Sequence, residues 1–501
     1  MYRLLIAAEK RKFYIMKRLM ESKDGISFRK ISEEIRCSVP TVRTYLMSLS
    51  VDWIGKVYFD FSKRGSVTLS NDRGVKFISV FSKIFANSQN FKIIQYLFFQ
   101  SFKTLEALKS PLHMNESGIY RAFDKINALS EDIGFSIKIK SMTLVGDSES
   151  VLRMQLVSVF EQAYLDGGWP FVEIDKHKIV DLIFEIGENF SIPMSYRVIN
   201  RMAIITAITF YRIKQGFNLE NHFLNTEDDK YELYLLKRKG AYQDAVMFPL
   251  DSMWYKELAR FIFVIHYGWE SDDERQQTVD EIMNFLNLLS AKLNFSIQPK
   301  EKESILMEFI YLYLEYRNQP KFRSTIQRDY CKNVERVMKR YLFFAKEVTY
   351  QLKQLERKMK FPWYSVLNYE SIWALIVGWT DLILLLSRNR PKVNIFVISS
   401  QGSSHSKMLS KLFRGRFSEG VKIKNSRHIY MEHDYKKLLK DASDSHIVVS
   451  TNDYSIISSD RMIVIDEIPS KEQIQLLEEK IEILRNELWF YCIAEQQQNV
   501  R

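Results

Sequence analysis

The chain has 501 residues, of which 46% are hydrophobic and 27% charged, and this ordinary globular composition excludes an intrinsically disordered chain. Its length corresponds to about three to five domains. Only 17 residues are Gly and 10 are Pro, so turn-forming residues are scarce and helices are favoured over an architecture of many strands.

The positive charge is concentrated at one end of the chain. Residues 1 to 150 contain 24 Lys and Arg against 15 Asp and Glu, a net charge of +9 out of +11 for the whole sequence. This asymmetry is typical of a chain whose N-terminal third binds a polyanion while the remainder has another role. A basic surface without a partner is the alternative.

The first elements in chain order predict a helix-turn-helix module. In ISEEIRCSVPTVRTYLMSLS, residues 31 to 50, apolar residues at helical spacing flank a three-residue joint, Arg36 to Ser38. Ser38 can cap the second helix, and proline in a first helical turn costs no hydrogen bond. That helix would offer short polar groups and a guanidinium to a major groove. The candidate DNA contacts are Ser38, Pro40, Thr41, Arg43 and Thr44. An ordinary helical hairpin is the alternative.

A two-stranded wing is predicted next, because apolar residues alternate in WIGKVYFDFSKRGSVTLS, residues 53 to 70. Basic side chains in a wing are suited to the phosphate backbone, which positions a protein on DNA without reading its sequence. The candidates for this role are Lys56, Lys63 and Arg64.

The same order of parts recurs between residues 104 and 153. Leu105 and Leu108 mark one helix, residues 113 to 117 the joint, and Ile119 the face of the next helix. Gly134 is predicted to end that helix, and FSIKIKSMTLVG alternates as a second wing. Two such modules in one basic third strengthen the prediction of DNA binding. The candidate contacts in the second module are Asn115, Ser117, Tyr120, Arg121 and Lys125.

Residues 151 to 390 read almost continuously as helices and contain no catalytic constellation. A boundary is predicted near residues 292 to 301, where Pro299 lies in a polar run. The longest apolar tract, residues 371 to 387, includes Asp381 and is shorter than the roughly 20 residues of a membrane span, so it is predicted to be a buried core helix. Three scattered cysteines without metal-binding spacing, and no secretory segment, indicate a cytoplasmic protein with no membrane association, metal or cofactor.

The last hundred residues alternate strands and helices, which predicts a parallel sheet. PKVNIFVISSQGSSHSKMLSKLFRGRF is a strand, a loop and a helix; IVVSTND and RMIVIDEIP are further strands; and a closing helix follows the cap candidate Ser470. The loop at residues 399 to 407 lacks the Walker pattern and is either an anion site at a helix start or a tight turn.

In the order of these parts the chain resembles the Mga/AtxA family of virulence regulators from Gram-positive bacteria. The resemblance covers essentially the whole chain and rests on ISEEIRCSVPTVRTYL, on MNESGIYRAFDKINAL with LVGDSESVLR, on FYRIKQG and on VNIFVISSQGSSHSKML. It implies a mainly α, multidomain fold. The implied domains are winged helix-turn-helix modules at residues 1–70 and 71–160, helical bundles similar to phosphotransferase-system (PTS) regulation domains at 161–291 and 292–390, and an enzyme IIB-like α/β domain at 391–501.

The resemblance also implies a function. The protein would be a transcription regulator that binds double-stranded promoter DNA, responds to carbohydrate phosphotransferase status, and forms a homodimer or higher oligomer. In such regulators a phosphocarrier protein would phosphorylate histidines of the regulation domains; the histidines in the first of these domains are His177, His222 and His266. None occupies the expected position seven residues before Arg212, which is Ile205, and no histidine lies between His266 and His405.

Two other functions compete with DNA binding. An RNA-binding antiterminator with paired regulation domains would begin with a β-rich module, whereas residues 25 to 50 are helical in pattern. An enzyme IIB-type phosphotransferase would need a nucleophilic cysteine where this chain has Ser399. The sequence therefore favours a regulator that is not an enzyme.

Overall fold

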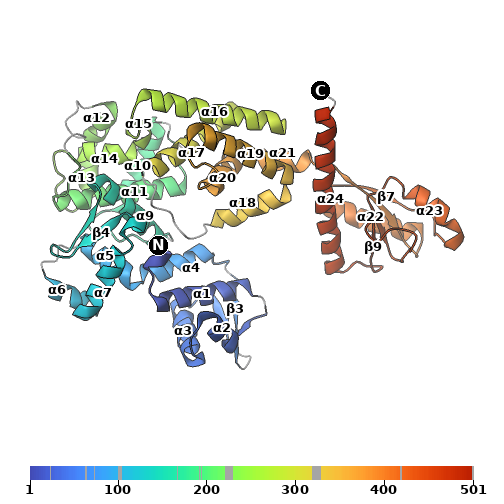
Figure 1. Ribbon diagram of the computed structural model, residues 1–501, viewed down its shortest axis with the longest axis horizontal. Coiled ribbons are helices and arrows are strands. Elements are labelled where there is room, and N and C mark those ends of the chain that lie inside the picture. Colours follow the sequence, from blue (N-terminus) through green and yellow to red (C-terminus); the bar gives the residue numbers. More distant parts are fainter. Residues whose placement is uncertain are drawn as a thin grey trace. The chain divides into compact units, whose positions relative to one another are not determined.

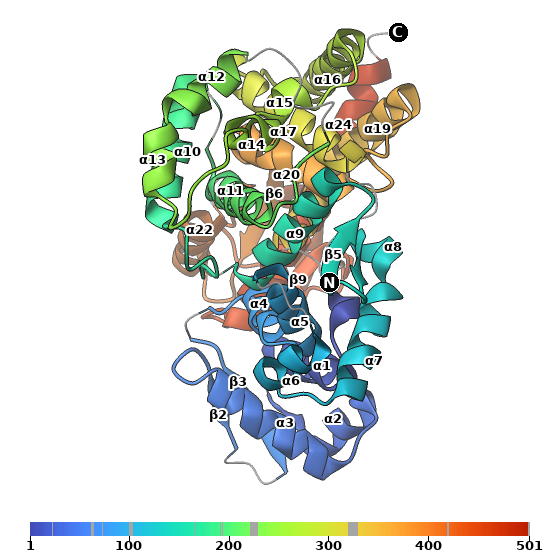
Figure 2. The ribbon, with the colours of Figure 1, turned by 90° about the vertical axis from the view of Figure 1, so that its left-hand side faces the viewer.

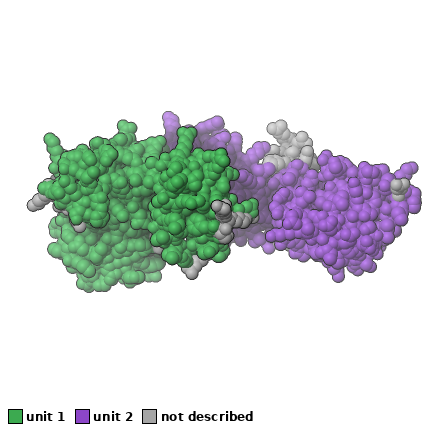
Figure 3. All heavy atoms as spheres, turned by 90° about the horizontal axis from the view of Figure 1, so that it is seen from below, with its two compact units in different colours: residues 1–276, 310–329 green, residues 277–309, 330–501 purple. Residues whose placement is uncertain are grey.

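The computed structural model describes all residues except 23, 62 to 64, 73, 100 to 103, 166, 191, 193, 221 to 228, 319 to 328, 418 to 419 and 499 to 501. The described part is mainly α-helical, with a four-stranded parallel sheet near the C-terminus, which confirms the predicted fold class (Figure 1). The chain forms two compact units: unit 1 holds residues 1 to 276 and 310 to 329, and unit 2 holds residues 277 to 309 and 330 to 501 (Figure 3). The five finer domain limits stay predictions.

The first module of unit 1 combines three helices with three short antiparallel strands (Figure 2). After a 3-10 turn at Tyr2–Leu4, its helices are α1 Ala7–Glu21, α2 Phe28–Ile35 and α3 Val39–Asp52. Its strands, in the order β1-β3-β2, are β1 Ile26–Ser27, β2 Tyr58–Asp60 and β3 Ser66–Ser70. The predicted wing is present, and a third strand of two residues, too short to show alternation, pairs with it.

The second module repeats this plan with a hairpin wing. Its helices are α4 Phe77–Ala86, α5 Gln89–Phe99, α6 Leu105–Leu112, α7 Glu116–Asn127, α8 Ser130–Ile133 and α9 Glu149–Ala163. The wing pairs β4 Phe135–Lys138 with β5 Thr143–Gly146. Two predictions were wrong in detail. Asn115 caps α7, so the joint ends two residues earlier than residue 117, and Gly134 ends the separate helix α8 rather than α7.

Twelve helices follow in the described part of residues 176 to 388. They are α10 Lys176–Phe190, α11 Tyr196–Lys214, α12 Lys230–Lys237, α13 Lys239–Asp244, α14 Trp254–Ile262, α15 Val264–Tyr267, α16 Asp272–Leu293, α17 Pro299–Asn318, α18 Asp329–Arg340, α19 Leu342–Met359, α20 Asn368–Gly378 and α21 Leu382–Arg388. An isolated antiparallel bridge joins Ile174 to Val246. Residues 294 to 298 separate α16 from α17, and the domain boundary near residues 292 to 301 stays a prediction.

The apolar tract at residues 371 to 387 is not one helix, which corrects the prediction. It contains most of α20 and α21, which meet at an angle of 85°. The backbone N–H of Thr380 donates to the carboxylate of Glu301 at 3.1 Å, so the helical hydrogen-bond series is interrupted there. Among the described residues no single helix has the length and apolarity to cross a membrane, although this bent pair meets the criterion when taken together.

The C-terminal part of unit 2 is the predicted α/β layer. Its elements are β6 Val393–Ile398, α22 Ser403–Phe417, β7 Val421–Asn425, a 3-10 turn at Glu432–Asp434, α23 Tyr435–Asp441, β8 Ile447–Ser450, β9 Met462–Val464 and α24 Lys471–Gln498. The strands are parallel in the order β7-β6-β8-β9, and Ser470 caps α24 as predicted. Sequence reasoning missed β7 and α23. Alternate residues of β6 enter two cores, with Ile395 packed on one face of the sheet and Phe396 on the other.

Candidate DNA-binding surface

Helix α3 of the first module is fixed by a cap at its start and a buried stripe along one side. Ser38 Oγ accepts the backbone N–H of Thr41 at 3.4 Å, and Arg36 adopts the left-handed conformation that turns the chain out of α2. The stripe, fully buried in the core of unit 1, is Val42, Leu46 and Leu49. Because these residues hold one side of the helix inward, the opposite side faces outward.

Several of the predicted contacts in the first module lie on this outward side. Pro40, Arg43 and Thr44 are exposed, and Thr41 is half-buried. The Arg43 guanidinium lies 5.4 Å from the ring centroid of Phe28, which holds it over α2. Thr44 Oγ1 donates to the carbonyl of Pro40 at 3.2 Å, so its hydroxyl proton is used within the helix.

Of the basic residues predicted for the first wing, one is described, and the structure places it in the turn before β2. Lys56 is exposed, and its ammonium lies 5.9 Å from the ring centroid of the buried Trp53. Lys63 and Arg64 lie outside the described residues.

The second module repeats the capped start of α3, and each residue is the same number of positions along the chain from its counterpart in the first module. His113 takes the left-handed conformation of Arg36, and the Asn115 carboxamide oxygen accepts the N–H of Gly118 at 2.9 Å, as Ser38 does for Thr41. The matching buried stripe is Ile119, Phe123 and Ile126. The cap and the buried stripe therefore occupy corresponding places in the two modules.

The outward side of α7 differs in charge from that of α3. Ser117, Tyr120 and Arg121 are exposed as expected, and Arg121 Nε donates to the carbonyl of Ser117 at 3.2 Å. Two carboxylates, Glu116 and Asp124, share this exposed side. It is therefore less attractive to phosphate than the outward side of α3.

Lys125 is turned away from that side. Its ammonium donates to the carbonyl of Leu5 at 3.0 Å, and partial burial lowers its pKa below the usual value for lysine. The structure therefore gives Lys125 a packing contact with the N-terminal segment, which is distant in the sequence.

Comparison with known proteins matches this surface to a family. The family model described as the Mga helix-turn-helix domain matches residues 74–159, the second module. The capsule synthesis positive regulator AcpA of Bacillus anthracis is 22% identical over 443 residues, covering 82% of this chain and 87% of that protein. The anthrax toxin expression trans-acting positive regulator of the same organism is 21% identical over 409 residues, covering 80% of this chain and 84% of that protein. The second module is thus similar to the Mga helix-turn-helix domain, and most of the chain is similar to these positive regulators. It is a DNA-binding transcription regulator.

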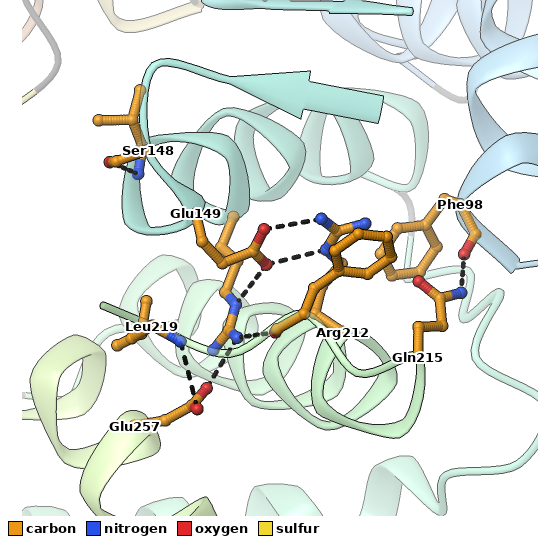
Figure 4. A network of polar contacts seen from close by, with 10 residues as sticks. Phe98, Ser148, Glu149, Arg212, Gln215, Leu219 and Glu257 are labelled. Carbon is orange, nitrogen blue, oxygen red and sulfur yellow. Dashed lines mark hydrogen bonds and ion pairs between the residues drawn. The ribbon is translucent and has the colours of Figure 1, made fainter. Parts of the chain in front are cut away.

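In this regulator the second module is joined to the helical region by a buried ionic network (Figure 4). Glu149, the first residue of α9, accepts two hydrogen bonds from Arg212 of α11, at 2.8 and 2.7 Å, and one from Arg153 at 2.9 Å. Arg153 continues to Glu257 of α14 at 2.7 Å and to the carbonyl of Phe217. Burial raises the pKa of Glu257 despite the neighbouring Arg153.

This network gives the RIKQG segment a structural role. Arg212 and Gln215 both reach the second module, since Gln215 Nε2 donates to the carbonyl of Phe98 at 2.6 Å. Ile205, in the position where the family resemblance implies a phosphorylatable histidine, is buried. Sequence reasoning missed Glu149, Arg153 and Glu257, because no local pattern pairs charges so distant along the chain.

The described histidines of the helical region differ in their surroundings. His177 lies exposed in the first turn of α10. The ring of His266 lies 4.4 Å from that of Tyr231, and its Nε2 is 3.1 Å from Asp229 Oδ2. Burial opposes ionisation of Asp229, but hydrogen bonds from Tyr267, two backbone N–H groups and His266 lower its pKa. His222 lies outside the described residues.

In the C-terminal loop Ser399 is buried and already hydrogen-bonded. Its hydroxyl is 2.7 Å from Nδ1 of His405 and accepts the backbone N–H of Gln401 at 3.0 Å. His405 Nε2 lies 3.0 Å from the carbonyl of Glu467, which can only accept, so Nε2 carries a proton. In the neutral ring Nδ1 is then the acceptor for the Ser399 hydroxyl. These bonds fix the loop at the carboxyl end of β6.

Proposed function

We propose that this regulator binds double-stranded promoter DNA through both helix-turn-helix modules and activates genes of the virulence or capsule class. The observation that carries the proposal is the repetition of one capped helix, held by matched buried residues, with an exposed arginine on the outward side of each copy. The positive-regulator names of the relatives support activation. Such a protein acts in the cytoplasm by stoichiometric binding, without chemistry of its own.

The residues that would contact DNA are those predicted from sequence, excepting Lys125. Arg43 and Arg121 would approach base edges, with Ser38, Pro40, Thr41, Thr44, Asn115, Ser117 and Tyr120 beside them. Lys56, with Lys63 and Arg64 of the same wing sequence, would hold phosphates.

Replacing either arginine is expected to weaken DNA binding. For Arg43→Ala and Arg121→Ala, loss of a base contact corresponds to about 1–3 kcal/mol, and loss of a phosphate contact reduces the slope of log affinity against log salt by about 1. The measurement is a salt titration of binding to a duplex that the wild-type protein selects from a random-sequence pool.

Arg238→Ala is the matched control, because Arg238 pairs with Glu185 in the helical region and should leave affinity unchanged. A flat salt response, with both arginine variants binding as well as wild type, would contradict the proposal. Selection of single-stranded RNA in preference to DNA would support the antiterminator.

We also propose, on the family resemblance, that the protein is a homodimer or higher oligomer and that a phosphocarrier protein phosphorylates a histidine of the helical region. Among the described candidates His266 has the most suitable surroundings. An ionised Asp229 can only accept a hydrogen bond, so it orients the ring with its proton on Nε2 and leaves Nδ1 as the nucleophile. The side chain of His266 is 38% exposed, which leaves it accessible to a donor protein.

Incubation with phosphorylated phosphocarrier protein is expected to place acid-labile phosphate on the wild-type chain but not on His266→Ala. His177→Ala, which removes the exposed histidine of α10, is the matched control and should remain labelled. Equal labelling of wild type and His266→Ala would rule out His266 as the acceptor, and sedimentation of the same samples measures the oligomeric state.

A further inference from the structure

The outward side of α3 carries a stripe of exposed apolar residues that the core does not use. Met47 and Val51 of α3 are 64% and 70% exposed, and Ile54, in the turn that follows the helix, is 82% exposed. Met47 follows Arg43 and Thr44 by about one helical turn and therefore lies on the same side of the helix. Sequence reasoning passed over Met47, although a helical wheel places it opposite the buried stripe.

Comparison with the second module shows that the fold does not need this apolar stripe. Corresponding residues of the two modules are always the same number of positions apart in the sequence. Val42, Leu46 and Leu49 correspond to Ile119, Phe123 and Ile126, and all six side chains are buried. At the positions of Met47, Val51 and Ile54 the second module has Asp124, Ala128 and Glu131. The stripe is thus a property of the outward surface of the first module, where exposed apolar groups in a row mark a binding site.

The chemistry of this side fits the major groove of DNA. The one acidic residue of α3 is Asp52, at its C-terminal end, so no carboxylate from Ser38 to Val51 opposes the approach to phosphates. The hydroxyl proton of Thr44 is bonded within the helix to Pro40. The outward side therefore presents the methyl groups of Thr44 and Met47 beside one guanidinium, that of Arg43. The C5-methyl of thymine is the apolar group that base edges display in the major groove.

We propose that α3 reads thymine, with the Met47 side chain contacting a thymine C5-methyl group. The inference rests on the proposed DNA-binding function and adds its base preference. Because a helix rises about 1.5 Å per residue, Met47 lies about 6 Å along the axis from Arg43. With base pairs 3.4 Å apart, the thymine is about two base pairs from the position that Arg43 contacts.

The test compares thymine with deoxyuridine, which pairs identically but lacks the methyl group. A duplex selected by the wild-type protein from a random pool is synthesised in both forms. Wild type is expected to lose about fourfold in affinity for each contacted methyl group that is removed. Met47→Ser is expected to bind the thymine duplex more weakly by a similar factor and to bind both forms equally. Met247→Ser, at an exposed methionine of the helical region, is the matched control and should behave as wild type.

The outcomes separate this inference from the function on which it rests. Tight wild-type binding that is equal for both duplexes would overturn thymine reading but leave DNA binding intact. Absence of binding to either duplex, at low salt, would remove the proposed function itself. A Met47→Ser variant that remains as sensitive to deoxyuridine as wild type would assign the methyl contact elsewhere and refute the role of Met47. Altered self-association of Met47→Ser with unchanged DNA affinity would make the stripe a protein interface and also refute it.

Discussion

Arg153→Met is expected to lower the unfolding free energy of unit 1 by about 3–5 kcal/mol, because it leaves the buried carboxylate of Glu257 without its cation, while Glu149 keeps Arg212. The Arg153 side chain is fully buried and pairs with Glu149 and Glu257. Methionine fills much of the volume of the arginine side chain, so the expected loss of stability comes from the missing charge rather than from a cavity. The pKa of Glu257, already raised by burial, should rise further when Arg153 is removed.

Amide hydrogen exchange measures this effect locally in a chain of several domains. Faster exchange is expected together in α9, α11 and α14, the three helices that the network joins. Glu257→Gln in the same chain should restore part of the loss, since it removes the unpaired charge. Arg29→Met, at an exposed pair with Glu33, should leave exchange in these helices unchanged. Slower or unaltered exchange in Arg153→Met would show that the network does not hold the helices together.

Phe160→Ala is expected to lower the free energy of unfolding by about 3–5 kcal/mol, the usual range for truncating a fully buried phenylalanine. Phe160 of α9 is completely buried. Its ring centroid lies 5.1 Å from that of Phe98 in the second module and 5.4 Å from that of Phe171, which precedes the helical region. The cavity would therefore lie between the module and the helices that follow it.

Thermal unfolding followed by near-ultraviolet circular dichroism would detect the loss of this aromatic packing. Phe184→Ala, at an exposed phenylalanine of α10, is the matched control and should change stability by less than about 0.5 kcal/mol. Equal transitions for the two variants would mean that the aromatic cluster around Phe160 adds nothing to the stability of unit 1.

Features set by neighbours in the sequence could be predicted from it. The cap by Ser38, the buried stripe from Val42 and the alternating strands each depend on residues within about one or two turns of one another. These local preferences agree with the overall fold. The order of elements in both modules and the parallel sheet could therefore be predicted from them.

Features set by distant contacts could not be predicted. The bend between α20 and α21 depends on Glu301, and Lys125 is turned by the carbonyl of Leu5. The sequence pattern identifies Arg212 only as part of the RIKQG segment, because its partner Glu149 lies 63 residues away. Met47 was missed for another reason, since an apolar residue in an amphipathic helix is ordinarily assigned to the core.

The repeated module separates the residues that build the structure from those that meet a partner. In both copies the cap and the buried stripe keep their places, while the outward positions have diverged from Met47 to Asp124 and from Arg43 to Tyr120. Under our proposal, substitutions on the outward side alter the preferred operator while the fold is retained. A regulator built in this way can be moved to new target genes by a few surface changes, and its two modules can evolve independent sequence preferences.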